Sequence, residues 1–81
     1  SDPEQRERLL KERLEALELT RQECKIALML MDGDGDAKIC EVLFISKNTL
    51  KFHIRNLNRK LGISNRRELP ALAERLLFGT E

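Results

Sequence analysis

The stretch from Ser46 to Leu61, SKNTLKFHIRNLNRKL, constrains the fold of this chain most strongly. It opens with Ser, a preferred N-cap residue, and no Gly or Pro interrupts it before Gly62. Its apolar residues recur at helical spacing and form one stripe: Leu50, Ile54, Leu57 and Leu61. Its basic residues recur every fourth position on another side: Lys47, Lys51, Arg55 and Arg59. The stretch predicts a helix with an apolar side for a core and a cationic side for an anionic partner.

The charges are unevenly distributed, although the net charge of the 81 residues is only +1. Residues 1–45 carry eleven acidic and seven basic side chains, whereas residues 46–81 carry three acidic and eight basic ones. Between Ser46 and Arg67 there are seven basic residues and no acidic one. Such a field of one sign favours a polyanionic partner, and an α-helix fits the major groove of B-DNA. We therefore predict an all-α helix-turn-helix domain that binds double-stranded DNA through a recognition helix at 46–61.

Local signals predict the helices that precede this one. Residues 4–18 form helices readily, and we interpret them as a linker helix from an upstream domain, which either packs on the rest of the chain or pairs with a second copy. Its apolar side comprises Leu9, Leu10, Leu14 and Leu17. Thr20 and Glu23 match a capping box that begins a helix over about 21–31, where we expect Glu23 also to pair with an Arg. A short helix at about 36–43 and a tight turn complete the helix-turn-helix, at about 36–61.

A last helix is predicted to end near Phe78, with Ser64 and Asn65 as its cap. Pro70 lies inside this segment, where a proline removes a hydrogen bond and clashes with the preceding turn. The helix therefore either begins late, near Arg67, or has a distorted first turn. Taken together, the predicted helices divide the chain into a linker at residues 1–18 and a DNA-binding domain at residues 19–81.

Several other kinds of site are disfavoured. Cys24, Cys40 and His53 cannot supply the four ligands of a zinc finger, and we expect reduced thiols and a packed imidazole. The run from Asp32 to Asp36 begins like a calcium-binding loop but lacks the required Gly and bidentate Glu. Without a phosphate-binding Gly loop or a nucleophile beside a base, we expect no enzyme, no cofactor and no metal. No apolar run approaches the length of a membrane span, so we expect no membrane contact by this segment.

The order and spacing of these residues resemble the LuxR-type helix-turn-helix, also called the GerE or NarL/FixJ output domain, from about Leu19 to Arg75. The residues that carry this resemblance are Leu19 to Glu23, Gly33, Ile39, Leu43, Ile45, Ser46, Thr49, Leu50, Lys51, His53, Lys60, Leu61, Gly62, Asn65 and Arg66. The resemblance implies a four-helix DNA-binding domain of cytoplasmic bacterial transcription regulators, whose parent protein could be membrane-anchored upstream. It also implies a homodimer and RNA polymerase as a candidate partner.

By position, the resemblance assigns contacts with DNA bases to Lys51, Phe52 and Arg55. It assigns contacts with phosphates to Ser46, Lys47, Thr49, Arg59, Lys60 and Arg66. The last helix of the family commonly forms the dimer contact. The apolar residues of the last helix here are either plain core or a dimer face, and we favour the dimer face because they exceed a narrow stripe: Leu69, Leu72, Leu76 and Leu77. The chain departs from the family pattern at three places. Gln22 replaces an Arg that forms an ion pair, and the Gly35-Asp36 pair weakens the cap of the short helix. Pro70 disturbs the geometry expected of the last helix.

Two other functions remain open at this point. The same basic face could bind an acidic protein partner, in which case the chain would be a helical interaction module. Alternatively, the chain could dimerise through its first helix without any role at DNA. A preference for one duplex sequence over a scrambled one would separate DNA recognition from both.

Overall fold

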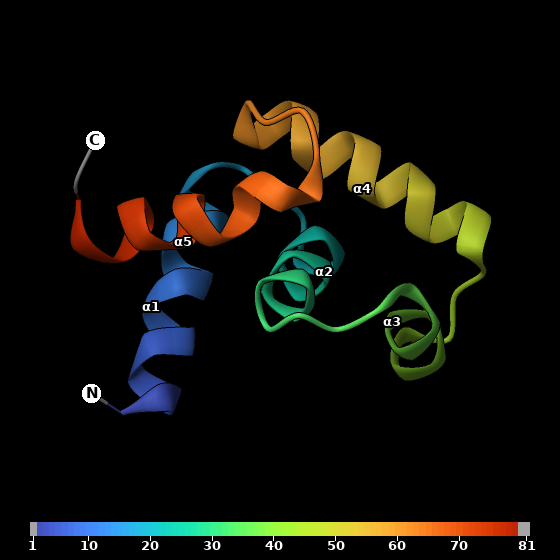
Figure 1. Cartoon of the computed structure of the whole chain (residues 1–81), viewed down its shortest axis with the longest axis horizontal. Coiled ribbons are helices and arrows are strands. Elements are labelled where there is room, and N and C mark those ends of the chain that lie inside the picture. The colour runs from blue at the N-terminus through green and yellow to red at the C-terminus, as the bar shows by residue number, and fades with distance from the viewer. Residues whose placement is uncertain (1, 80–81) are drawn as a thin grey trace.

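The computed structural model describes residues 2–79 of the chain, and these residues form helices joined by short turns (Figure 1). No strand occurs among the residues described. In chain order the elements are α1 (Pro3–Ala16), α2 (Arg21–Met31), α3 (Asp36–Leu43), α4 (Lys47–Leu61), the 3₁₀ turn η1 (Arg66–Glu68) and α5 (Leu69–Phe78). The prediction of an all-α fold is confirmed, with α2, α3 and α4 where the sequence placed them. None of the helices within residues 2–79 has both the length and the apolar composition needed to cross a bilayer.

Side chains at the helix starts explain these bounds. Thr20 accepts a hydrogen bond from the Glu23 backbone N–H at 3.1 Å, and Glu23 Oε1 accepts one from the Thr20 N–H at 2.9 Å. This is the predicted capping box of α2. Ser46 caps α4 in the same way, since its hydroxyl accepts from the Thr49 N–H at 3.1 Å. By contrast, the N-cap of α3 is Gly35, which provides no side-chain hydrogen bond, in agreement with the weaker cap expected there.

The core is formed by aliphatic side chains from every helix. Leu14, Ile26, Ile39, Leu50 and Leu57 are among the largest side chains with almost no exposed surface. They come from α1, α2, α3 and α4, so the apolar stripe of α4 faces the core as its spacing predicts. Cys24 is buried, Cys40 is half-buried, and both are free thiols. Burial raises the pKa of the Cys24 thiol, and the nearby carboxylates of Glu15 and Glu23 add to this effect.

Helix α1 packs on the rest of the chain, against α2 and α5. Its residues Leu10 and Leu14 are buried, whereas Leu17 is 40% exposed. The helix ends at Ala16, two residues before the predicted end, because Glu18 adopts a left-handed conformation with φ of 67°. Of the two arrangements expected for this segment, the structure contains the first, in which α1 is part of the core.

The segment around Pro70 forms two elements in place of one helix. Asn65 caps the 3₁₀ turn η1, and α5 begins at Leu69, so that Pro70 lies in its first turn. A proline is tolerated there because the N–H it lacks would have no partner within the helix. Of the two alternatives expected here, the structure favours the late start, with α5 beginning at Leu69, two residues beyond the expected Arg67, after the 3₁₀ turn.

The predicted dimer face needs a correction. Leu69 is fully buried and Leu72 is 7% exposed, because α5 packs on α1 and α2 of the same chain. Both side chains belong to the core of the monomer, so the prediction that they face a second copy is wrong. Leu76 and Leu77 are half-buried, and Phe78 beyond them is 69% exposed.

Candidate nucleic-acid interface

The exposed face of α4 is a continuous cationic surface. It consists of Lys47, Asn48, Lys51, Phe52, Arg55 and Arg59, which we call the α4 face. Four of these six side chains are basic and none is acidic. Helix α4 packs on α2 and α3 (Figure 1), and its residues on the side of the core are the buried and half-buried ones, whereas the face consists of exposed residues. The helix is about 22 Å long, so the cations span several phosphate spacings of a duplex.

The cations of the α4 face form no ion pair with any other described residue. Three ion pairs occur among residues 2–79, and none involves Lys47, Lys51, Arg55 or Arg59. Their charge is therefore not neutralised by the described part of the chain. The structure thus leaves the predicted base-contacting residues Lys51 and Arg55 exposed to solvent.

Phe52 lies on the α4 face, as its position on the helix predicts. It is 54% exposed, and its ring meets the His53 ring edge-on at a centroid distance of 5.7 Å. His53 is half-buried at the border of the apolar stripe. An exposed aromatic ring among cations suits apolar contact with a thymine methyl group in the major groove.

The start of α4 is held by its own hydroxyl groups. The Ser46 hydroxyl accepts from the Thr49 N–H and lies 3.0 Å from the Thr49 hydroxyl oxygen, to which it donates. The Thr49 hydroxyl hydrogen remains available for an external acceptor such as a phosphate oxygen. Phosphate contacts by Ser46 and Thr49 stay predictions.

Lys60 forms an ion pair within the fold, and its phosphate contact stays a prediction. Its ammonium lies 2.7 Å from Glu23 Oε1 and donates to the Glu18 carbonyl oxygen at 3.3 Å. Glu23 is only 4% exposed, so this pair ties the end of α4 to the start of α2 inside the fold. The partner of Glu23 is a lysine and not the arginine that the sequence suggested. Burial opposes ionisation of Glu23, but donation from Lys60 and Thr20 outweighs it, and the pKa of Glu23 lies below its usual value.

Arg66 is close to the α4 face but already has a partner. Its Nη1 lies 2.6 Å from Asp36 Oδ1, and its Nη2 lies 3.5 Å from Oδ2. The hydrogen bond from Arg66 holds the pKa of Asp36 below its usual value, and the charges of Lys47 and Lys51 act in the same direction. Asp36 thus occupies part of the Arg66 guanidinium, and the phosphate contact of Arg66 stays a prediction.

Sequence reasoning missed two residues of this surface. Asn48 is exposed on the α4 face, and its position four residues before Phe52 was the available signal. Asp36 was noted in the run that resembles a calcium-binding loop and in the weak cap of α3, but not as a partner of Arg66, and that contact joins residues thirty positions apart. No local spacing rule predicts such a contact.

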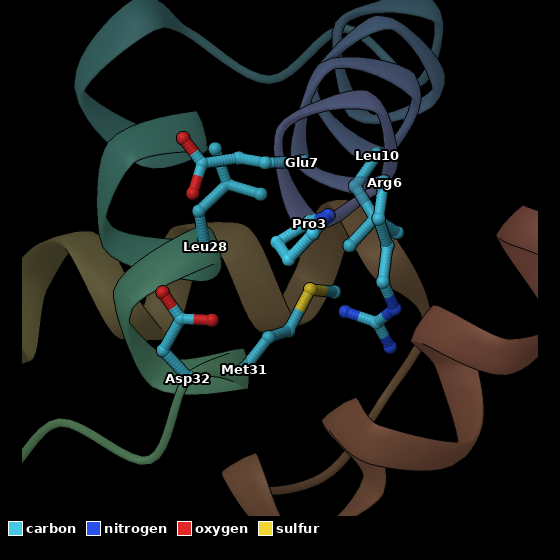
Figure 2. Close-up of a pocket in the computed structure, with 7 residues that line it drawn as sticks. All are labelled: Pro3, Arg6, Glu7, Leu10, Leu28, Met31 and Asp32. Atoms are coloured by element: carbon cyan, nitrogen blue, oxygen red, sulfur yellow. The ribbon is translucent and has the colours of Figure 1, made fainter. Parts of the chain in front are cut away.

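The groove between α1 and α2 does not suggest a competing site for a polyanion. This groove is shown in Figure 2; its lining residues are Pro3, Arg6, Glu7, Leu10, Leu28, Met31 and Asp32. Its charged side chains carry both signs, so it does not favour a polyanion. Within residues 2–79 no group of three or more His, Cys, Asp or Glu side chains is placed to hold a metal ion.

Comparisons with known proteins agree with this geometry. The family model described as bacterial regulatory proteins, luxR family (GerE), matches residues 17–73. The HTH-type transcriptional regulator MalT of Vibrio campbellii is 39% identical over 59 residues, which are 73% of this chain and 6% of MalT. MalT of Yersinia pestis is 37% identical over the same shares. The transcriptional regulatory protein DegU of Brevibacillus brevis is 38% identical over 48 residues, which are 59% of this chain and 20% of DegU.

The chain thus spans only a small part of each of these relatives. No solved structure matches the chain at a significant level. The matched residues 17–73 contain α2, α3, α4 and η1 completely, together with the first part of α5.

Proposed function

Because the chain belongs to the luxR family of bacterial regulatory proteins and is thus a DNA-binding domain of transcription regulation, we propose that its α4 face reads base sequence in the major groove. The family is one of DNA-binding regulators and not an enzyme family. The observation that carries the proposal is the α4 face itself, with an exposed aromatic ring and four cations that have no ion-pair partner among residues 2–79.

The central residues of the face are proposed to contact bases. Lys51 and Arg55 can donate to guanine O6 and N7, and Phe52 can contact a thymine methyl group. Lys47 and Arg59 lie at the two ends of α4, where we place phosphate contacts. Phosphate contacts fix the register of a helix on the duplex, whereas base contacts decide the sequence.

The likeness to transcription regulators supports three further proposals about the setting. We place the chain in the bacterial cytoplasm, as the output part of a longer regulator with residues 1–18 as its linker. We propose that it acts as a homodimer, so that two copies of α4 enter successive major grooves. RNA polymerase is the proposed second protein partner, and recruitment of polymerase to a duplex bound by the chain would test this contact.

Two substitutions test base reading against mere charge. Duplexes that the chain prefers are first selected from a random pool, and their binding is compared with that of scrambled duplexes. Arg55→Ala is expected to reduce the preference for the selected duplex by roughly 5- to 150-fold, since a good base contact contributes about 1–3 kcal/mol. Lys47→Ala is the matched control, because it removes one exposed cation from the same helix and should weaken both duplexes alike.

The outcomes separate the candidate functions. If Arg55→Ala weakens selected and scrambled duplexes equally, Arg55 does not read a base. If the unchanged chain shows no preference among duplexes, the α4 face does not recognise sequence, and an acidic protein partner becomes the better explanation of its charge.

A further inference from the structure

The carboxylate of Asp36 is the one acidic group that the described structure places directly against a cation beside the α4 face. The Asp36–Arg66 pair joins the start of α3 to η1, and its side chains are 40% and 43% exposed. Asp36 lies near enough to Lys47 and Lys51 for their charges to stabilise its ionised form. A negative charge at this position opposes the attraction of the surface for a polyanion.

We propose that Asp36 competes with DNA phosphate for Arg66, holding the guanidinium in the free protein and lowering the affinity for duplexes of every sequence. This inference rests on the proposed function, because it requires the α4 face to lie against DNA. It concerns the Asp36–Arg66 ion pair, which lies at the border of the α4 face.

The chemistry of the two anions makes them direct competitors. A guanidinium presents its N–H groups as a planar fork, which fits a carboxylate and a phosphate equally well. When a phosphate takes over Arg66, the carboxylate of Asp36 loses its partner and remains beside the negative backbone of the duplex. Both effects act on the phosphate backbone, which carries no direct sequence information. The cost to affinity should therefore be the same for selected and scrambled duplexes.

The fold does not require this carboxylate. Asp36 makes no side-chain cap of α3, whose N-cap is Gly35. An exposed ion pair contributes little to stability, so its loss should leave the helices intact. The Arg66 guanidinium donates to Asp36, with the shorter contact at 2.6 Å. Among the described residues it donates to no other acceptor.

The test substitutes Asp36→Asn, which keeps the size of the side chain and removes its charge. We expect binding to selected and scrambled duplexes to tighten by roughly two- to fivefold, the range of an exposed ion-pair energy. Asp34→Asn is the matched control, since it removes the same charge two residues earlier in the chain, just before α3. Asp34 pairs instead with Lys38, 3.1 Å away on the adjacent turn, and not with a residue of the α4 face. An equal gain in both variants would mean that net charge alone is responsible and would overturn the proposal.

A second comparison shows whether the effect passes through Arg66. In an Arg66→Gln background no guanidinium can be released, so adding Asp36→Asn should bring a smaller gain, which comes only from the removed repulsion between the carboxylate and the duplex. A gain as large as in the unchanged background would overturn the competition. Thermal unfolding of each variant checks that all of them fold alike. If the unchanged chain binds no duplex, the proposed function falls and this inference with it, whereas normal binding with no gain in Asp36→Asn overturns the inference alone.

Discussion

The contact between Lys60 and Glu23 determines how α4 is held against α2. The Glu23 carboxylate is buried, and Lys60 is its cationic partner at 2.7 Å, the one cation that pairs with it in the described part of the chain. We predict that Lys60→Met lowers the free energy of unfolding by about 1–3 kcal/mol at neutral pH, because it leaves a buried carboxylate without its counter-charge. The value is placed below that of a fully buried pair because the Lys60 side chain is 25% exposed. Urea unfolding measures the change.

The same pair predicts how this difference varies with pH. The pKa of Glu23 is lowered in the folded chain, so ionised Glu23 stabilises the fold above its ordinary value of 4.5. That contribution is lost as the pH falls through the lower pKa of the folded state. The effect of Lys60→Met should therefore be largest near neutral pH and shrink below about pH 4.5.

The control for this substitution is Lys38→Met. Lys38 forms an exposed pair with Asp34, so its loss should change the free energy of unfolding by less than about 1 kcal/mol. An equal effect of the two substitutions, or a Lys60→Met effect that does not change with pH, would contradict the structural role of Lys60.

At the scale of residues, periodicity predicted exposure well and ion-pair partners poorly. The four-residue spacing of Lys47, Lys51, Arg55 and Arg59 was sufficient to place them on one exposed face. The partners of Lys60 and Arg66 lie 37 and 30 positions away in the chain. Such contacts depend on how the helices cross, and a basic residue bound to a distant acid has the same local pattern as a free one.

At the scale of elements, the helix bounds followed from local chemistry wherever a cap was present. Thr20 and Ser46 begin their helices as predicted. The end of α1 could not be predicted, because the left-handed conformation of Glu18 has no glycine to signal it. Pro70 indicated that the last helix would not be regular, but it did not indicate which irregular structure would form. The observed 3₁₀ turn before α5 is one of several ways to accommodate a proline.

The role of α1 gives a prediction at this scale. If α1 is part of the core, Leu14→Ala should lower the free energy of unfolding by about 2–5 kcal/mol, since the fully buried side chain leaves a cavity. Leu17→Ala, at a position that is 40% exposed on the same segment, is the matched control and should cost much less. Similar small losses for both would mean that α1 does not contribute to the stability of the domain.

At the scale of the whole molecule, the free ends of α1 and α5 lie away from α3 and the start of α4 (Figure 1). Apolar side chains gather near the end of α5, where Leu76 and Leu77 are half-buried and Phe78 is exposed. This leaves a second copy room to pack there while each α4 face remains free for DNA. The buried positions Leu69 and Leu72 could not be told from surface positions by sequence, because α5 is apolar on most of its sides.

A dimer of this kind predicts cooperative binding to paired half-sites. Two copies should occupy a duplex whose half-sites lie about one turn, ~34 Å, apart. Leu77→Glu should abolish the two-copy complex and leave binding to a single half-site nearly unchanged. Sedimentation of the protein–duplex complex gives the stoichiometry. A one-copy complex formed by the unchanged chain on paired half-sites would contradict the dimer.

The central claim, that the α4 face lies in the major groove, can be measured on the DNA. Dimethyl sulfate methylates guanine N7, which is exposed in the major groove, and adenine N3, which is exposed in the minor groove. On a selected duplex, bound protein should protect guanine N7 at the preferred bases, and Arg55→Ala should remove the protection at one of them. Protection of adenine N3 alone, with every guanine N7 still reactive, would contradict the account.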